Sequence, residues 1–196
     1  MSDRRAALRL AVAGMGLWLA AALPLAAQDG PGPNLVIELA GQANGRIVID
    51  LRDDVAPKHV AQITTLARAG AYDGVVFHRV IEGFMAQTGD VMYGKRGADL
   101  SRAGMGGSDF PDLPAEFSSL PFDAGVVGMA RSRSPDSANS QFFITFAPAP
   151  HLDGQYTVVG SVIEGMEVLN AIKRGNSAAN GLVSSPDYMA KVTVEE

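Results

Sequence analysis

Alternating apolar and polar residues predict short strands along most of this chain. In residues 46–51, Ile47, Ile49 and Leu51 occupy every second position and therefore share one face of a strand. The turn-forming pair Asn44-Gly45 separates this run from an earlier one at residues 35–39. Comparable runs follow at residues 75–80, 84–87, 125–130, 141–146, 156–163 and 191–195. The pattern thus predicts eight strands.

Two segments show helical spacing instead. Pro57 suits a first helical turn, and Val60, Ile63 and Ala67 follow on one face before Gly70 ends the segment. A second helix is predicted at residues 165–174. Two helices among eight short strands favour a closed barrel or a sandwich, and they are too few for a doubly wound sheet.

The first 27 residues have the layout of a secretory signal peptide. Arginines near the start precede an uncharged apolar run at residues 10–23, and Pro24-Leu25-Ala26-Ala27 ends it. The alternative is an uncleaved membrane anchor, but the apolar run is short for a span of about 20 residues. We therefore expect Sec-type export, cleavage after Ala27, and a periplasmic or secreted product without stable membrane association. Residues 28–33 would form a flexible leader, and residues 34–196 a single domain.

Charge and composition exclude several classes of protein. The chain has 16 Lys+Arg and 21 Asp+Glu, a net charge of −5. Residues 1–27 contain three Arg and one Asp, so 13 basic and 20 acidic residues remain and the net charge becomes −7. An acidic protein of this kind is not expected to bind nucleic acid. With no cysteine and three widely separated histidines, no metal site is expected either.

A glycine-rich tract at residues 93–111 begins with a false phosphate-binding motif. Residues 89–95 spell G-x-x-x-x-G-K, but the next residue is Arg96 rather than the Ser or Thr that would bind Mg²⁺. No helical pattern follows this motif. Nucleotide binding is therefore not expected, and a loop this long is usually functional or mobile.

Two segments could carry chemistry. Strand periodicity places Arg79 on a face with Phe77 and Ile81, where a guanidinium needs polar partners such as Gln87. The residues alone favour a structural role, in which Arg79 pairs with Asp90 or Glu116. In residues 141–146, one alternate set carries a polar–aromatic–polar row that suits either a binding surface or a solvent-facing strand.

The same segments are similar to the signature of the cyclophilins. The resemblance extends in order over nearly all of residues 34–195, which makes it highly specific. It is carried by residues 72–79, 87–89, 106–107, 113–117, 128–130, 139–144, 151–154, 159–162 and 164–166. It implies a mostly β fold, a closed eight-stranded antiparallel β-barrel capped by two α-helices. It also implies cofactor-free peptidyl-prolyl cis/trans isomerase activity on proline-containing peptides and unfolded or partly folded proteins.

Residue by residue, the resemblance assigns Arg79 as the catalytic arginine and His78 as a structural neighbour. The substrate-binding residues it implies are Phe84, Met85, Gln87, Ala130, Arg131, Gln141, Phe143, His151, Leu152 and Tyr156. Three of these depart from many family members: His151 replaces a tryptophan, Tyr156 a histidine and Arg131 an asparagine. The first change predicts weak binding of cyclosporin. We expect a monomer, and the alternative function is a proline-peptide binding module or chaperone without useful turnover.

Overall fold

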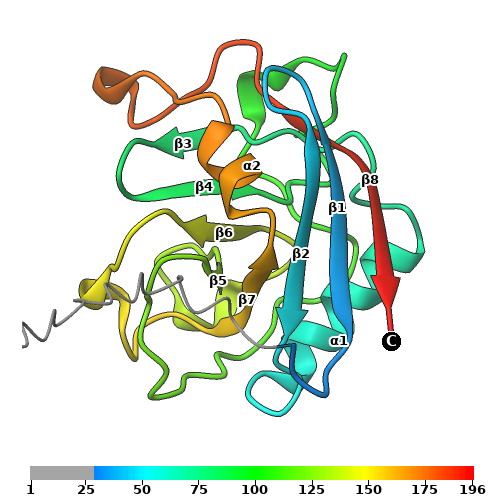
Figure 1. Cartoon of the computed structure of the whole chain (residues 1–196), viewed down its shortest axis with the longest axis vertical. Coiled ribbons are helices and arrows are strands. Elements are labelled where there is room, and N and C mark those ends of the chain that lie inside the picture. Colours follow the sequence, from blue (N-terminus) through cyan, green and yellow to red (C-terminus); the bar gives the residue numbers. More distant parts are fainter. Residues whose placement is uncertain (1–28) are drawn as a thin grey trace, which may run out of the picture.

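A computed structural model describes residues 29–196, so the predicted signal peptide lies outside the described residues. Within this range eight strands form one antiparallel sheet in the order β3-β4-β6-β5-β7-β2-β1-β8 (Figure 1). The strands are β1 (Asn34–Ala40), β2 (Gly45–Leu51), β3 (Arg79–Ile81), β4 (Met85–Thr88), β5 (Val126–Met129), β6 (Phe142–Thr145), β7 (Val158–Glu164) and β8 (Tyr188–Glu195). The predicted number of strands is confirmed for this part of the chain.

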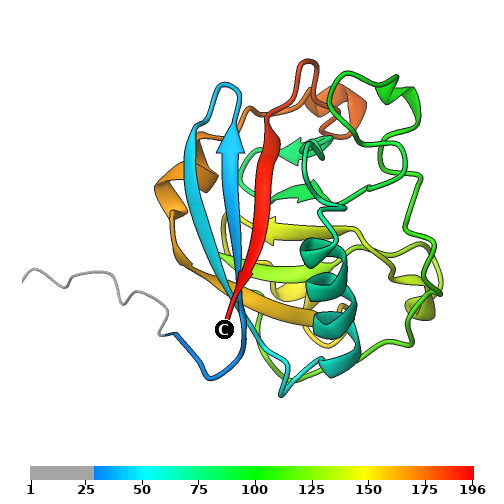
Figure 2. The same cartoon turned by 90° about the vertical axis from the view of Figure 1, so that its right-hand side faces the viewer.

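The two α-helices cover different parts of the curved sheet. Helix α1 (Pro57–Arg68) packs against β8, and α2 (Met166–Ala171) packs against β2. Figure 2 shows them on opposite sides of the layer formed by β1, β2 and β8. The second helix is shorter than predicted, because the backbone at Ile172 is already extended (φ −56°, ψ 135°).

The barrel is not closed by a regular ladder within residues 29–196. Strands β3 and β8 are the two ends of the sheet order, and only isolated contacts join their neighbourhoods. Val76 bridges Tyr188, while Val75 bridges Lys95 on another segment, so the predicted strand at residues 75–80 begins only at Arg79. The expectation of a closed barrel is therefore corrected to an open, strongly curled antiparallel sheet with two helices.

The main core fills the concave side of this sheet. On β1 and β2, Leu35 is paired with Ile49 and Ile37 with Ile47, and all four side chains are buried. Helix α1 adds Val60, Ile63, Leu66 and Ala67 from one face. Each fully buried Val, Leu or Ile side chain contributes about 1.5–3 kcal/mol, so this burial is a large favourable contribution to folding.

A second, smaller apolar cluster lies on the other face of the sheet. Along β6, Phe142 and Ile144 enter the main core, while Phe143 between them points to the opposite side. The second cluster consists of Met85, Phe122, Phe143, Ala149, Leu152 and Val158. Alternation therefore gives β4, β5 and β6 apolar side chains on both faces, and the outer set is available to line a cavity.

Candidate active site

A cavity of about 300 Å³ opens over the second apolar cluster. Ten of the eleven site residues predicted from the sequence line it: Arg79, Phe84, Met85, Gln87, Ala130, Arg131, Phe143, His151, Leu152 and Tyr156. The eleventh, Gln141, lines an adjoining cavity of about 450 Å³ together with the loop at residues 104–107. The structure thus brings the predicted residues together, while their individual roles stay predictions.

Aromatic packing forms the floor of the 300 Å³ cavity. The Phe143 ring stacks on Phe122 with centroids 5.7 Å apart and meets Tyr156 edge-on at 5.7 Å. Gly128 makes room for this arrangement, since a Cβ there would lie 2.5 Å from Cζ of Phe143. At the rim, the Phe84 and His151 rings are 5.4 Å apart. The result is a rigid apolar floor suited to a small hydrophobic ring.

Arg79 lies on the polar side of the cavity and is held by uncharged acceptors. Its Nε donates to the backbone carbonyl of Asn180 (3.0 Å), Nη2 donates to Oδ1 of Asn180 (3.0 Å), and Nη1 donates to Oε1 of Gln87 (3.1 Å). Burial lowers the pKa of Arg79, with a small opposing effect of Tyr156, yet an arginine stays protonated in proteins. A full positive charge therefore lies in the same cavity as the apolar floor.

The alternative interpretation of Arg79 as part of a structural ion pair is wrong. Among residues 29–196 none of the ion pairs includes Arg79. The buried Asp90 carboxylate instead accepts hydrogen bonds from the backbone N–H groups of Met92, Tyr93, Gly104 and Gly106. The expected common face with Phe77 is also absent, because Phe77 precedes the regular strand and enters the main core.

A chain of amide groups extends from Arg79 to the glycine-rich loop. Gln87 Nε2 donates to Oε1 of Gln141 (3.0 Å), and Gln141 Nε2 donates to the carbonyls of Gly104 (3.0 Å) and Gly106 (2.7 Å). Asp90 holds the same loop from its other side. The resemblance implied Gln87 and Gln141 as substrate-binding residues, and both line the adjoining cavity. The sequence gives no signal for the hydrogen bond between them.

Lys95 of the false phosphate-binding motif is occupied by protein groups. Its Nζ donates to the carbonyls of Ala71 and Asp73, the latter at 2.7 Å. Burial lowers the pKa of this ammonium group, which the nearby Asp73 partly offsets. The lysine thus serves to join two segments of the chain.

Arg131 and Tyr156 form another wall of the cavity. The Arg131 guanidinium carbon lies 4.4 Å from the centre of the Tyr156 ring, and Nη2 donates to the carbonyl of Gln155 (3.0 Å). The backbone N–H of Ala130 donates to the carbonyl of Gln141 (2.9 Å). These contacts join the wall to β6.

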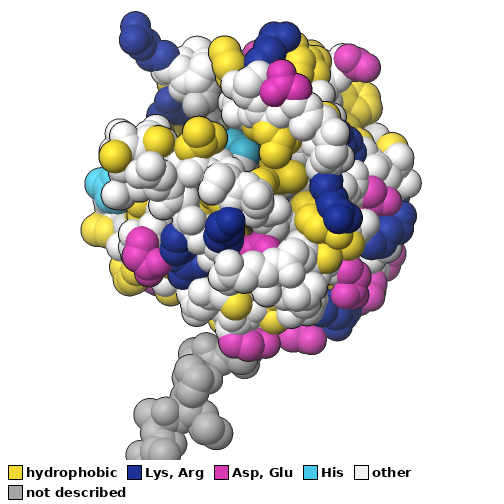
Figure 3. Space-filling view, turned by 90° about the horizontal axis from the view of Figure 1, so that it is seen from above, with side chains coloured by type: hydrophobic (Ala, Val, Ile, Leu, Met, Phe, Trp, Pro, Cys, Tyr) yellow, Lys and Arg dark blue, Asp and Glu magenta, His cyan; other side chains and the backbone are white. Residues whose placement is uncertain are grey.

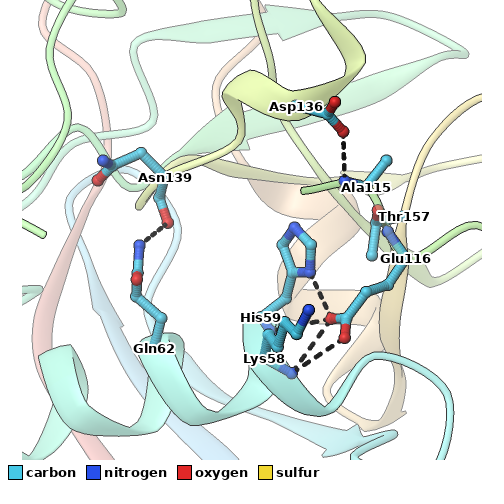
Figure 4. Close-up of polar contacts among 8 residues, drawn as sticks. All are labelled: Lys58, His59, Gln62, Ala115, Glu116, Asp136, Asn139 and Thr157. Atoms are coloured by element: carbon cyan, nitrogen blue, oxygen red, sulfur yellow. Dashed lines mark hydrogen bonds and ion pairs between the residues drawn. The ribbon is translucent and has the colours of Figure 1, made fainter. Parts of the chain in front are cut away.

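A polar cluster lies at the start of α1 (Figure 4). Glu116 accepts hydrogen bonds from the backbone N–H groups of Lys58 and His59, and its Oε2 lies 2.6 Å from Nδ1 of the buried His59 ring. The backbone N–H of Glu116 donates to Oγ1 of Thr157 (3.0 Å), next to Tyr156. Burial raises the pKa of Glu116, but these hydrogen bonds and the electrostatic interaction with His59 outweigh it, so the pKa of Glu116 is lowered.

His78, beside Arg79, is a buried imidazole with an unusual pKa. Its side chain is 4% exposed, and neither ring nitrogen has a hydrogen-bond partner among the described residues. The pKa of this imidazole is lowered from 6.5 to about 4, chiefly by burial and least by Arg79, while Asp90 and the carbonyl of Val76 act in the opposite direction. The ring is therefore neutral at physiological pH, which suits the structural role expected from the sequence.

We expect the free energy of unfolding to decrease as the pH falls from about 6.5 towards 4. In this window the unfolded chain protonates His78 while the folded chain does not, so acid favours the unfolded state, by about 3 kcal/mol at pH 4. Urea denaturation at pH 7, 6, 5 and 4 on wild type and His78→Gln measures the effect, because carboxylate titrations cancel in the comparison. Equal pH dependence in both proteins would contradict the assignment.

Comparisons with known proteins agree with this geometry. The family model described as "Cyclophilin type peptidyl-prolyl cis-trans isomerase/CLD" matches residues 35–194. A protein of Brucella suis biovar 1 (strain 1330) named "Probable peptidyl-prolyl cis-trans isomerase" is 53% identical over 197 residues, which cover 100% of this chain and 98% of that protein.

Two crystal structures extend the likeness to three dimensions. A cyclophilin from Hirschia baltica has a TM-score of 0.67 at 26% identity, covering 82% of this chain and 73% of that one. A Cryptosporidium parvum cyclophilin-type isomerase, determined in the presence of the dipeptide Ala-Pro, has a TM-score of 0.70 at 26% identity and covers 83% and 99%.

Proposed function

Because this chain belongs to the family of cyclophilin-type peptidyl-prolyl cis-trans isomerases, we propose that it isomerises X-Pro bonds in exported proteins as they fold, with Arg79 as the catalytic residue. The observation that carries the proposal is the charged guanidinium of Arg79, held by three neutral hydrogen-bond acceptors in a cavity with an apolar floor.

The reaction needs a donor that acts only on the twisted amide. The barrier of roughly 18–20 kcal/mol is the loss of amide resonance as the C–N bond rotates. Uncatalysed, the step takes tens to hundreds of seconds. In the twisted state the proline nitrogen regains a lone pair and accepts a hydrogen bond, so a donor aimed at it stabilises the transition state more than the ground state.

The residues around Arg79 supply the remaining requirements. The proline ring would lie on the apolar floor formed by Phe143, Met85 and Leu152, where it would displace water. The chain before the proline would lie along the adjoining cavity, where Gln87 and the backbone near Ala130 can hold one side of the amide. When one side of the X-Pro amide is held in place and the other side is free to turn, binding promotes rotation about the C–N bond.

An exchange assay on the mature protein tests this function. A short Ala-Pro peptide should show cis/trans exchange in NMR that rises in proportion to enzyme concentration. Peptide binding without faster exchange would favour the alternative, a proline-peptide binding module or chaperone without turnover.

The place of action is a separate part of the proposal. It is supported by the signal-peptide pattern of residues 1–27. Cell fractionation followed by intact-mass measurement should find a periplasmic or secreted protein that begins at Gln28. An unprocessed cytoplasmic product would refute the proposed export but would not affect the proposed isomerase activity.

A further inference from the structure

The loop that contains Asn180 pairs through its backbone with the outer edge of β3. It follows the 3₁₀ helix Ser177–Ala179, and the backbone of Leu182 bridges that of Arg79. Hydrogen bonds from Val80 N–H to the Gly181 carbonyl (2.8 Å) and from Val183 N–H to the His78 carbonyl (3.1 Å) hold it there. Figure 3, seen from above, shows apolar side chains among both basic and acidic ones at this end of the molecule. Leu182 in this loop is 55% exposed.

Asn180 binds the Arg79 guanidinium through two of its own oxygens. The backbone carbonyl accepts from Nε and the side-chain Oδ1 accepts from Nη2, each at 3.0 Å. With the bond from Nη1 to Gln87, three of the five guanidinium N–H donors are used. One N–H on Nη1 and one on Nη2 remain, so Asn180 fixes which donors are free for the substrate.

The backbone conformation at this position restricts which residues can make both contacts. Asn180 is left-handed, with φ 53° and ψ 36°. Besides glycine, asparagine and aspartate adopt this conformation most readily. Glycine offers no side-chain acceptor. Aspartate would place a negatively charged carboxylate next to the Arg79 guanidinium and offset its positive charge. Asparagine is the residue type that accepts a second hydrogen bond here and leaves the guanidinium with its full charge.

We propose that Asn180 is a positioning residue for Arg79: it orients the guanidinium towards the cavity through uncharged acceptors and thereby sets the turnover rate. This inference rests on the proposed function of Arg79. It concerns kcat more than KM, because the orientation of a donor that acts on the twisted amide affects the transition state more than the bound ground state.

Two substitutions at this position separate orientation from charge. Asn180→Gly keeps the left-handed backbone and its carbonyl but removes Oδ1, and should lower kcat about fivefold with KM changed less than about twofold. Asn180→Asp keeps the shape but pairs a carboxylate with Arg79, and should lower kcat about tenfold. Ser185→Asp is the matched control, since Ser185 is exposed, lies in the same loop, and is the other non-glycine residue with positive φ (52°) within residues 29–196.

NMR of the arginine side chain gives a second measurement. In wild type the Nη groups of Arg79 should be distinguishable, because hydrogen bonds hinder rotation about the Nε–Cζ bond. Asn180→Gly should average these signals, whereas Ser185→Asp should leave them unchanged along with kcat. If Asn180 mattered only for the stability of the loop, the Arg79 Nη signals would not be expected to average in Asn180→Gly.

The outcomes separate this inference from the function it rests on. Wild-type kcat in both Asn180 variants, with Arg79→Ala impaired, would overturn positioning by Asn180 and leave the role of Arg79 intact. Full activity in Arg79→Ala would remove the proposed mechanism and this inference with it.

Discussion

Arg79→Ala is expected to lower kcat/KM by about one to two orders of magnitude. A hydrogen bond from a charged donor contributes on the order of 1.5–3 kcal/mol, and about 1.36 kcal/mol corresponds to tenfold in rate. The bond forms fully only when the amide is twisted, so most of the loss should fall on kcat rather than on KM.

The measurement is the NMR exchange assay with a short proline peptide, on wild type and variant at matched concentration. Arg52→Ala is a suitable control, because Arg52 makes an ion pair with Asp54 and does not line the cavity. Arg79→Lys should recover little, since an ammonium group cannot reproduce the three directed hydrogen bonds of the guanidinium. Wild-type activity in Arg79→Ala would refute the proposed mechanism.

Phe143→Ala is expected to lower the free energy of unfolding by about 3–5 kcal/mol, the range for removing a buried aromatic side chain. Phe143 is 5% exposed and holds Phe122 and Tyr156 in contact with one ring. Its loss would leave a void beneath the cavity that neighbouring side chains cannot fill without moving. Urea denaturation with linear extrapolation measures the change.

Phe143→Leu provides the comparison for this prediction. Leucine keeps most of the apolar volume, so its destabilisation should be about 1–2 kcal/mol, but it cannot stack on Phe122. If the apolar floor also binds the proline ring, Phe143→Leu should raise KM while the protein stays folded. A loss of less than about 1 kcal/mol in Phe143→Ala would show that Phe143 is not part of a tightly packed cluster.

The sequence pattern predicted the strands that carry the site, because burial acts on every second residue of a strand. The alternation in β6 separates Phe142 and Ile144 from Phe143, and the fold confirms that they enter different apolar clusters. Periodicity failed at residues 75–78, where successive residues pair with different segments and no ladder forms. It could not decide barrel closure either, since closure depends on how distant strand ends meet.

The family resemblance assigned to one site residues that strand periodicity could not connect. Arg79 and Phe143 lie 64 positions from one another in the chain, yet both line the same cavity. The strand pattern alone favoured an ion pair between Arg79 and either Asp90 or Glu116. In the fold Asp90 holds the glycine-rich loop and Glu116 holds the start of α1. How far these two carboxylates lie from Arg79 depends on how the whole chain folds, and a local sequence pattern does not predict it.

The sequence by itself determined which residue types this protein has available: an arginine between apolar positions, an aromatic row on one strand, and a signal-like N-terminus. Only the tertiary structure decided what the arginine contacts. Asn180 lies 101 residues after Arg79, in a loop with no strand or helix pattern, and it reaches the guanidinium because that loop pairs with the edge of β3. Hydrogen bonds act over about 3 Å in space, and separation along the chain does not predict them.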